Sequence, residues 1–264
     1  MGNSFQNLIR YIEQKTPFRC QSYKEKPLKR RLRVRMRVLD IKDFAKYETY
    51  LRDNDTELEK LVETLTINLS YFFRNPETFF FLKDYIFPVL KRKKDNLVFW
   101  SAGCAQGEEP YSLAIMVAES RMLDNVKIFG TDIDSRVLEV AHQGLYSDTA
   151  FQYTPDDLQK KYFKRVPDGH LIDTRLKERV TFLNVDLFAT PPFGPCDLII
   201  CRNVMIYLDR NAQSTILKNF YDYLKPDGYL VIGKVELLIG IPEVELFNTV
   251  SRVEHVYQRK EMSL

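Results

Sequence analysis

The chain has 264 residues, of which 45% are hydrophobic and 28% charged, so it can bury a core in one large domain or two small ones. It contains no apolar run near the ~18 residues that a membrane-spanning helix needs, and we expect no membrane insertion and a cytoplasmic location. Its four cysteines and three histidines lack the paired spacing of zinc sites, which argues against a structural zinc centre and against a disulfide framework.

The first 95 residues show helical patterns and no convincing strand, and we assign residues 1–95 to an N-terminal helical domain. Within it, residues 24–37 carry eight Lys or Arg and one Glu, a net charge of +7, so the rest of the chain carries 3 − 7 = −4. Apolar residues recur here at helical spacing and predict one buried face. The stripe comprises Leu28, Leu32, Met36 and Leu39.

The basic side chains of this segment lie opposite that stripe on a helical wheel and should point outward. They are Lys26, Arg30, Arg33 and Arg37. Two interpretations remain open: an ordinary solvated helix face, or a docking surface for an acidic partner.

From residue 96 onward, short apolar runs alternate with helical segments, which is typical of a doubly wound α/β sheet. One helix should begin at Pro110, another after the N-cap Asp134. A third should cover residues 211–224 and end at a turn over residues 225–228. We expect buried strands at residues 97–100, 126–130, 180–185, 197–201 and 229–233. We assign residues 96–264 to this second domain.

One connection within the second domain is unusually long. More than thirty residues separate His142 from Arg179, and structureless loops of that length are uncommon in compact domains. The sequence Pro167-Asp168-Gly169 predicts a turn between strands at residues 162–166 and 170–174. We therefore expect a small inserted β subdomain over residues 144–180.

The stretch SAGCAQGEEPYS (101–112) follows the first of these strands and opens a helix. A helix N-terminus normally favours anions, yet Glu108 and Glu109 stand there and would repel a pyrophosphate. The glycines, Gly103 and Gly107, also lack the dinucleotide-binding spacing. The loop therefore favours S-adenosylmethionine, a phosphate-free adenosine compound with positive charge, and we expect Gly103 of this loop to contact it.

Two further carboxylates support that cofactor. Asp132 ends the strand VKIFGTD, where α/β nucleotide folds place a carboxylate that accepts ribose hydroxyls. Asp186 ends the strand VTFLNVD, where its side chain is placed to bind the adenine amino group. Either residue alone would be a common structural cap. Acidic groups at successive strand ends predict a cofactor site at the carboxyl edge of the sheet.

The loop GEEPYS, together with TINLSYFFRNPETFF (66–80) before it and CRNVMIYLD (201–209) after it, resembles motifs of the CheR-type chemotaxis receptor methyltransferases, which esterify glutamates of bacterial chemoreceptors. The resemblance implies a class I methyltransferase fold with an N-terminal all-α domain, a mostly parallel seven-stranded sheet and a small antiparallel β subdomain. The matching stretches are TINLSYFFRNPETFF (66–80), FWSAGCAQGEEPYSLA (99–114), GTDIDSRVLEVAHQGLY (130–146), CRNVMIYLD (201–209) and LKPDGYLVIG (224–233).

The resemblance also implies site residues where the motifs agree. Glu109 and Asp132 match cofactor ligands, and Tyr207 matches a tyrosine that lines the active site. The chain departs from many relatives at Lys234-Val235, where a His-Ser pair is frequent. The remaining implied cofactor residues are Asn68, Ser70, Arg74, Asp186, Leu187, Arg202 and Asn203.

The implied reaction needs no general base, because a glutamate with a reference pKa of about 4.3 is already ionised at pH 7. We expect Arg74 to orient the incoming carboxylate and Tyr207 to donate a hydrogen bond to it; the alternatives are a surface pair with Glu77 for Arg74 and core packing for Tyr207. The basic face, Arg30, Arg33 and Arg37, would then meet the glutamate-rich helices of the receptors.

Two other functions, nucleic-acid methylation and non-catalytic cofactor binding, agree with parts of the sequence. A nucleic-acid methyltransferase would use the basic helix for phosphates, and residues 190–193 (TPPF) are similar to an amino-methylation motif. That motif should follow the fourth strand, whereas here it precedes it. The second alternative is a non-catalytic cofactor-binding scaffold, against which the presence of Arg74, Glu109, Asp132 and Tyr207 argues.

Overall fold

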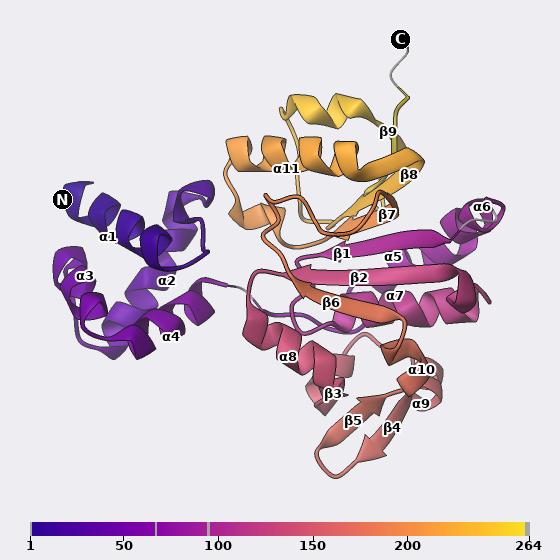
Figure 1. Cartoon of the computed structure of the whole chain (residues 1–264), viewed down its shortest axis with the longest axis horizontal. Coiled ribbons are helices and arrows are strands. Elements are labelled where there is room, and N and C mark those ends of the chain that lie inside the picture. Colours follow the sequence, from indigo (N-terminus) through magenta and orange to yellow (C-terminus); the bar gives the residue numbers. More distant parts are fainter. Residues whose placement is uncertain (1, 67, 94–95, 262–264) are drawn as a thin grey trace. The chain divides into compact units, whose positions relative to one another are not determined.

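The computed structural model describes residues 2–66, 68–93 and 96–261. The chain divides into two compact units, one formed by residues 1–67 and 207–213 and the other by residues 68–206 and 214–264 (Figure 1). The division proposed from sequence at residue 95 marks the start of the first strand, whereas the compact units divide at residue 67.

The first unit is helical. It contains α1 (Gly2–Lys15), η1 (Cys20–Ser22), α2 (Glu25–Val38), α3 (Phe44–Arg52) and α4 (Asp55–Leu65). The side chain of Asp43 caps α3 by accepting a hydrogen bond from the backbone N–H of Ala45 (2.9 Å). Helix α1 packs on α3 and α2 on α4. Their apolar faces share one buried core that includes Leu8, Ile12, Leu32, Tyr47 and Leu61.

Helix α2 has the two faces that its sequence predicts. Leu28, Leu32 and Met36 are buried, and Leu39, just beyond the helix, is partly buried. The basic side chains on the other face are exposed: Lys26, Arg30, Arg33 and Arg37.

The second unit is built on a seven-stranded sheet, as predicted. Its strands are β1 (Leu97–Ala102), β2 (Val126–Asp132), β6 (Val180–Asn184), β7 (Cys196–Cys201), β8 (Leu224–Ile232), β9 (Phe247–Ser251) and β10 (Val256–Arg259). Their order is β6-β2-β1-β7-β8-β10-β9. The first five in this order pair in parallel, and β10 is antiparallel to both β8 and β9. The carboxyl ends of β6, β2, β1 and β7 therefore meet at one edge.

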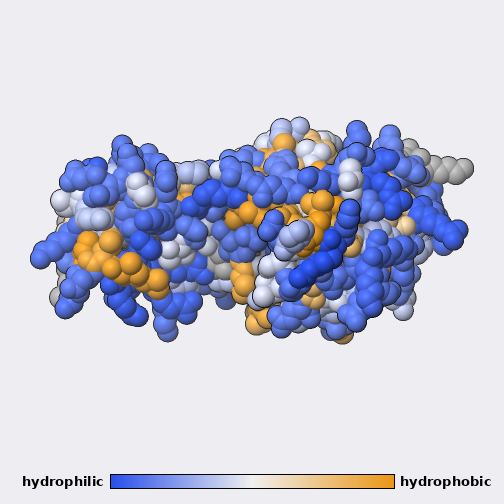
Figure 2. Space-filling view, turned by 90° about the horizontal axis from the view of Figure 1, so that it is seen from below, coloured by the Kyte–Doolittle hydropathy of each residue, from blue (hydrophilic) through white to orange (hydrophobic). Residues whose placement is uncertain are grey.

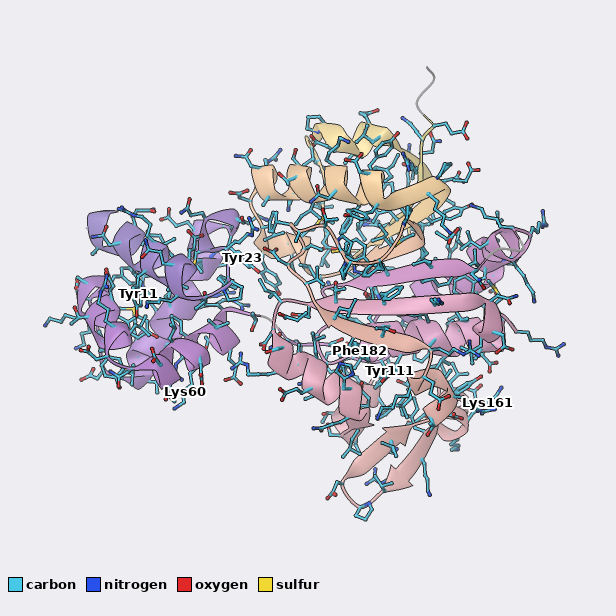
Figure 3. The ribbon with its side chains drawn as sticks, viewed as in Figure 1. Tyr11, Tyr23, Lys60, Tyr111, Lys161 and Phe182 are labelled. Carbon is cyan, nitrogen blue, oxygen red and sulfur yellow. The ribbon has the colours of Figure 1, made fainter. Side chains whose placement is uncertain are left out.

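Helices pack on both faces of this sheet. Successive residues of β1 point to opposite faces: Phe99 stacks on Phe87 of α6, and Trp100 meets Phe220 of α11 edge-on. On the first of these faces, Tyr111 of α7 contacts Phe182 of β6, with ring centroids 5.4 Å apart (Figure 3). The helices are α5 (Pro76–Phe81), the π-helical turn η2 (Leu82–Ile86), α6 (Phe87–Lys91), α7 (Glu108–Glu119), η3 (Leu123–Asn125), α8 (Ser135–Gln143), η5 (Met205–Tyr207), α11 (Arg210–Tyr223) and η6 (Pro242–Leu246).

The insertion forms a separate antiparallel sheet with the order β3-β5-β4 (Figure 1). The hairpin lies where the sequence places it. Gly169 has φ +140°, and a Cβ there would lie 2.3 Å from the backbone oxygen of Tyr146, so only glycine fits. The insertion contains β3 (Leu145–Tyr146), η4 (Asp148–Phe151), α9 (Asp156–Tyr162), β4 (Phe163–Val166), β5 (Gly169–Ile172) and α10 (Thr174–Lys177).

One expected turn is wrong. Residues 225–228 were predicted to follow a helix as a turn, but β8 already begins at Leu224. Leu224 pairs with Cys196, and the next pair is Tyr229 with Leu198, so the intervening residues bulge out of the ladder. Asp227 takes the left-handed φ of +58° that this bulge requires.

In the described ranges, no helix has the length and apolar character to cross a bilayer, and no group of His, Cys, Asp and Glu is arranged to hold a metal ion. The four cysteines are free and buried. The face shown in Figure 2 is mostly hydrophilic, with small separate hydrophobic patches, which is normal for a protein surface.

Candidate functional site

The loop between β1 and α7 closes tightly over the end of β2. The backbone N–H groups of Gly103 and Cys104 both donate to the backbone oxygen of Thr131 (2.8 and 2.9 Å). Gly103 has φ +78°, and a Cβ there would lie 2.5 Å from Cγ2 of Val204. Glycine is therefore required here, because a side chain would push the loop away from the segment after β7.

Glu109 occupies the first turn of α7, at the carboxyl end of β1. Its Oε1 accepts a hydrogen bond from the hydroxyl of Ser101 (2.8 Å), and its Oε2 pairs with Nη1 of Arg202 (3.4 Å). Burial raises the pKa of Glu109, while the nearby guanidinium of Arg202 lowers it. The side chain is still 12% exposed, so a carboxylate lies at the surface of the site.

Asp132 ends β2 and lies beside the same loop. Its Oδ2 accepts from the backbone N–H of Ala105 (2.9 Å) and its Oδ1 from that of Asp134 (3.0 Å). Burial raises the pKa of this carboxyl, and the two N–H bonds oppose the rise. The N–H of Ile133 is a third donor to this carboxylate, which leaves about one of its roughly four acceptor positions for a ligand hydroxyl. This acceptor fits the hydroxyls of the ribose of an adenosine cofactor, which donate hydrogen bonds.

Residues 68–75, which we call the strap, run without helix or strand between α4 and α5. Nδ2 of Asn68 donates to Oδ2 of Asp134 (3.2 Å), and the N–H of Phe73 donates to the hydroxyl of Ser112 on α7 (2.9 Å). Ser70 forms a hydrogen bond with Glu108. The strap therefore brings the predicted residues Asn68 and Ser70 to the carboxyl edge of the sheet.

Arg202 follows β7 and is 6% exposed. Besides Glu109, it binds the backbone oxygen of Arg74 and, at 2.9 Å, Oδ1 of Asn75. Its Nε is buried and has no partner among the described residues. Arg202 thus joins the end of the strap to Glu109 beneath it.

The guanidinium of Arg74 lies close enough to Glu109 to lower the pKa of that carboxyl. Its one hydrogen bond among the described residues goes to the backbone oxygen of Leu69 (3.3 Å). Glu77, the partner in the alternative surface pair, contacts Lys234 instead (3.4 Å). The guanidinium of Arg74 therefore makes few hydrogen bonds with the described residues, and it lies beside the predicted cofactor site.

The other predicted residues of the second unit follow strand ends. Oδ1 of Asp186 accepts from the N–H of Phe188 (2.9 Å) just beyond β6, and Leu187 between them is partly buried. Asn203, directly after Arg202, has a left-handed φ of +63°. The structure thus brings Gly103, Glu109, Asp132, Arg202 and Asn203 to one edge of the sheet.

Sequence reasoning did not assign a role to Glu236, which is 2% exposed. Its Oε1 accepts from the backbone N–H groups of Val204 (3.0 Å) and Met205 (2.7 Å), and its Oε2 accepts from that of Gly233. Burial raises its pKa to about 7, against these bonds. Glu236 fixes the turn that carries Arg202 and Asn203. No local signal around Glu236 indicates this role, because the N–H groups of Val204 and Met205 lie about thirty residues earlier in the chain.

Tyr207 belongs to the first compact unit. Its backbone oxygen accepts from the N–H of Lys24 (2.9 Å), and the guanidinium of Arg31 lies over its ring, 5.2 Å from the centroid. Its catalytic role remains a prediction from the sequence.

Comparison with known proteins identifies two matching family descriptions. Residues 3–66 match "CheR methyltransferase, all-alpha domain", and residues 68–253 match "CheR methyltransferase, SAM binding domain". The chain is 33% identical over 252 residues to the chemotaxis protein methyltransferase of Borreliella burgdorferi, covering 90% of this chain and 89% of that protein. It is 36% identical over 245 residues to the protein of the same name in Salmonella typhimurium, covering 88% and 83%.

Among solved structures, the chain is similar to the N-methyltransferase NodS of Bradyrhizobium japonicum in complex with S-adenosyl-L-homocysteine. That match has a TM-score of 0.42 and 16% identity, and it covers 68% of this chain and 86% of NodS.

Proposed function

Because the chain belongs to the CheR methyltransferase family, we propose that it transfers a methyl group from S-adenosylmethionine to glutamate side chains of chemoreceptors, forming methyl esters. The observation that carries this proposal is the pair of partly buried carboxylates, Glu109 and Asp132, at the carboxyl ends of the adjacent strands β1 and β2, with the guanidinium of Arg74 near Glu109.

The residues present fit the cofactor. Glu109 is suited to its ammonium and Asp132 to its ribose hydroxyls, while Asp186 and Leu187 would lie beside the adenine. The cofactor supplies a methyl group activated by a sulfonium. We propose that the rest of its binding surface comes from Asn68, Ser70, Arg74, Gly103, Arg202 and Asn203.

The protein's task in the reaction is to place and orient the incoming carboxylate. Arg74 suits this because its guanidinium can bind both oxygens at once. No general base is needed, since the substrate glutamate is ionised at neutral pH. Opposite charges cancel as the ester forms, so a site poor in water favours the reaction. Positioning of this kind lowers barriers by on the order of 7–11 kcal/mol.

We further propose that the exposed basic face of α2 docks the acidic helices of the receptor. Reversing two charges with Arg30→Glu and Arg33→Glu should reduce receptor methylation about tenfold at low salt and leave the affinity for S-adenosylhomocysteine unchanged. Initial rates with receptor vesicles and calorimetry with the nucleoside measure the two effects.

The matched control for this double variant is Lys46→Glu with Lys60→Glu, which changes charge equally on α3 and α4 of the same unit. Both lysines are exposed. Equal losses in the two double variants would show that net charge matters rather than this face, and loss of nucleoside binding would show damage to the fold.

The function is tested by incubating the protein with methyl-labelled S-adenosylmethionine and either chemoreceptor or RNA. We expect base-labile label in the receptor, because carboxyl methyl esters hydrolyse in alkali. Stable label in RNA would support the nucleic-acid alternative. Cofactor binding without transfer to a panel of receptors would support a scaffold and contradict the proposal.

A further inference from the structure

Glu108 is a buried carboxyl group to which the proposed chemistry gives no task. It stands next to Glu109 in the first turn of α7, but its side chain takes a different direction and is 2% exposed. Its Oε2 has no hydrogen-bond partner among the described residues. A carboxyl held this way costs free energy, so its presence calls for a compensating role.

The contacts of Glu108 lead to the strap. Its carboxyl forms a hydrogen bond with the side chain of Ser70. Its backbone oxygen accepts from the hydroxyl of Ser112 (2.6 Å), and that same hydroxyl accepts from the N–H of Phe73 (2.9 Å). Two points of the strap, three residues apart, are therefore fastened to α7: Ser70 by the carboxyl of Glu108, and Phe73 by the hydroxyl of Ser112.

The strap in turn ends at the cofactor site. Beyond Phe73 lies Arg74, whose backbone oxygen is held by Arg202, the partner of Glu109. The two neighbouring glutamates thus have different roles. Glu109 faces the site, and Glu108 contacts the strap, which carries Asn68, Ser70 and Arg74.

We propose that Glu108 is a positioning residue that fastens the strap over the cofactor site, and that this fastening is stronger when its carboxyl is ionised. The inference rests on the proposed function only in taking an adenosine compound as the ligand.

The electrostatic surroundings give the direction of the effect. Burial raises the pKa of Glu108 from 4.5 to about 7, and the bond from Ser70 opposes the rise. The other groups that face it are the phenol of Tyr146 and the thiol of Cys104, and burial holds the pKa of each well above its usual value, so both stay neutral. Glu109 beside it and Asp132 also have raised pKa values, and they are common to every variant below.

The stability of the folded protein and its affinity for the ligand should change in opposite directions as the pH rises. Between pH 4.5 and 7 the folded protein holds a proton on Glu108 that the unfolded chain has lost, so stability falls as pH rises through this window. The ammonium group of the ligand favours the ionised carboxyl, and so does a hydroxyl donor such as that of Ser70. Binding should therefore lower the pKa of Glu108, and affinity should rise with pH.

The test measures affinity for S-adenosylhomocysteine by calorimetry between pH 6 and 8. The wild type should bind about fivefold more tightly at pH 8 than at pH 6, which is what a fall of about one unit from a pKa of about 7 gives over this range. Glu108→Gln keeps an oxygen that can accept from Ser70 but cannot ionise. We expect its affinity at pH 6 to stay within about threefold of wild type and its gain at pH 8 to disappear.

Glu108→Ala removes both the bond to Ser70 and the group that ionises, so it should bind about tenfold more weakly than Glu108→Gln, show no gain at pH 8, and exchange hydrogen faster in residues 68–75. The matched control is Glu139→Gln, at an exposed position on α8, which should behave as wild type. If Glu108→Gln retains the full pH dependence, the inference is overturned, even if Glu108→Ala fails to fold. Failure of wild type and control to bind the nucleoside would instead contradict the proposed function.

Discussion

Replacing Glu109 by glutamine should weaken binding of S-adenosylhomocysteine about a hundredfold and lower the melting temperature as well. A neutral amide cannot neutralise the ammonium of the ligand, which removes the main charge pairing of the site. It also leaves Arg202 buried without its carboxylate, and losing one member of a buried pair costs about 3–5 kcal/mol. Calorimetry measures the first effect and thermal unfolding the second.

Two further variants separate these effects. Glu119→Gln makes the same substitution at the other end of α7, where the carboxylate pairs with Lys161 at the surface (2.6 Å), and should leave affinity unchanged. Adding Arg202→Met to Glu109→Gln removes both charges but also the bonds of Arg202 to Arg74 and Asn75, so it should recover part of the stability without recovering affinity. Nucleoside binding by Glu109→Gln within threefold of wild type would show that the carboxylate does not select the ligand.

The elements of the second unit follow closely from sequence because their signals are local. The strand β7 (CDLIIC) is buried at every position, and such continuous apolar runs are typical of parallel strands covered on both faces. Asp134 caps α8 with its own side chain. The order β6-β2-β1-β7-β8-β10-β9 is non-local and was not predicted, since the resemblance implied only a mostly parallel sheet of seven strands.

The bulge at residues 225–228 shows where local signals fail. Proline, aspartate and glycine favour turns and bulges alike. Which one forms depends on the neighbouring strand, since Leu224 and Tyr229 pair with Cys196 and Leu198 on β7. The sequence of residues 225–228 does not by itself indicate that the segment will lie beside β7.

The difference between local and non-local signals also explains how much of the site could be predicted from the sequence. The carboxyl ends of successive strands meet at one edge by topology, so Glu109 and Asp132 could be placed together before any coordinates. The role of Glu236 could not be predicted, because its partners are backbone N–H groups of a turn about thirty residues earlier. The different surroundings of Glu108 and Glu109 also could not be predicted, because the two residues are adjacent in the same motif.

Replacing Arg74 by alanine should lower kcat for receptor methylation by about a hundredfold to a thousandfold, while affinity for S-adenosylhomocysteine changes less than tenfold. Removing one preorganised donor from a reacting oxygen typically costs that much. The strap should stay in place, because Arg202 holds the backbone oxygen of Arg74 and not its side chain. Single-turnover rates with saturating cofactor measure the effect on chemistry.

Arg74→Lys distinguishes charge from geometry at this position. Lysine keeps the positive charge beside Glu109 but cannot bind both oxygens of a carboxylate in a planar fork, so we expect it to recover only a small part of the lost rate. Arg92→Ala, at an exposed position after α6, is the matched control and should retain full activity. A lysine variant as fast as wild type would mean that Arg74 supplies charge alone. An alanine variant that loses nucleoside affinity and rate in equal measure would make Arg74 a cofactor ligand without a role in orienting the substrate.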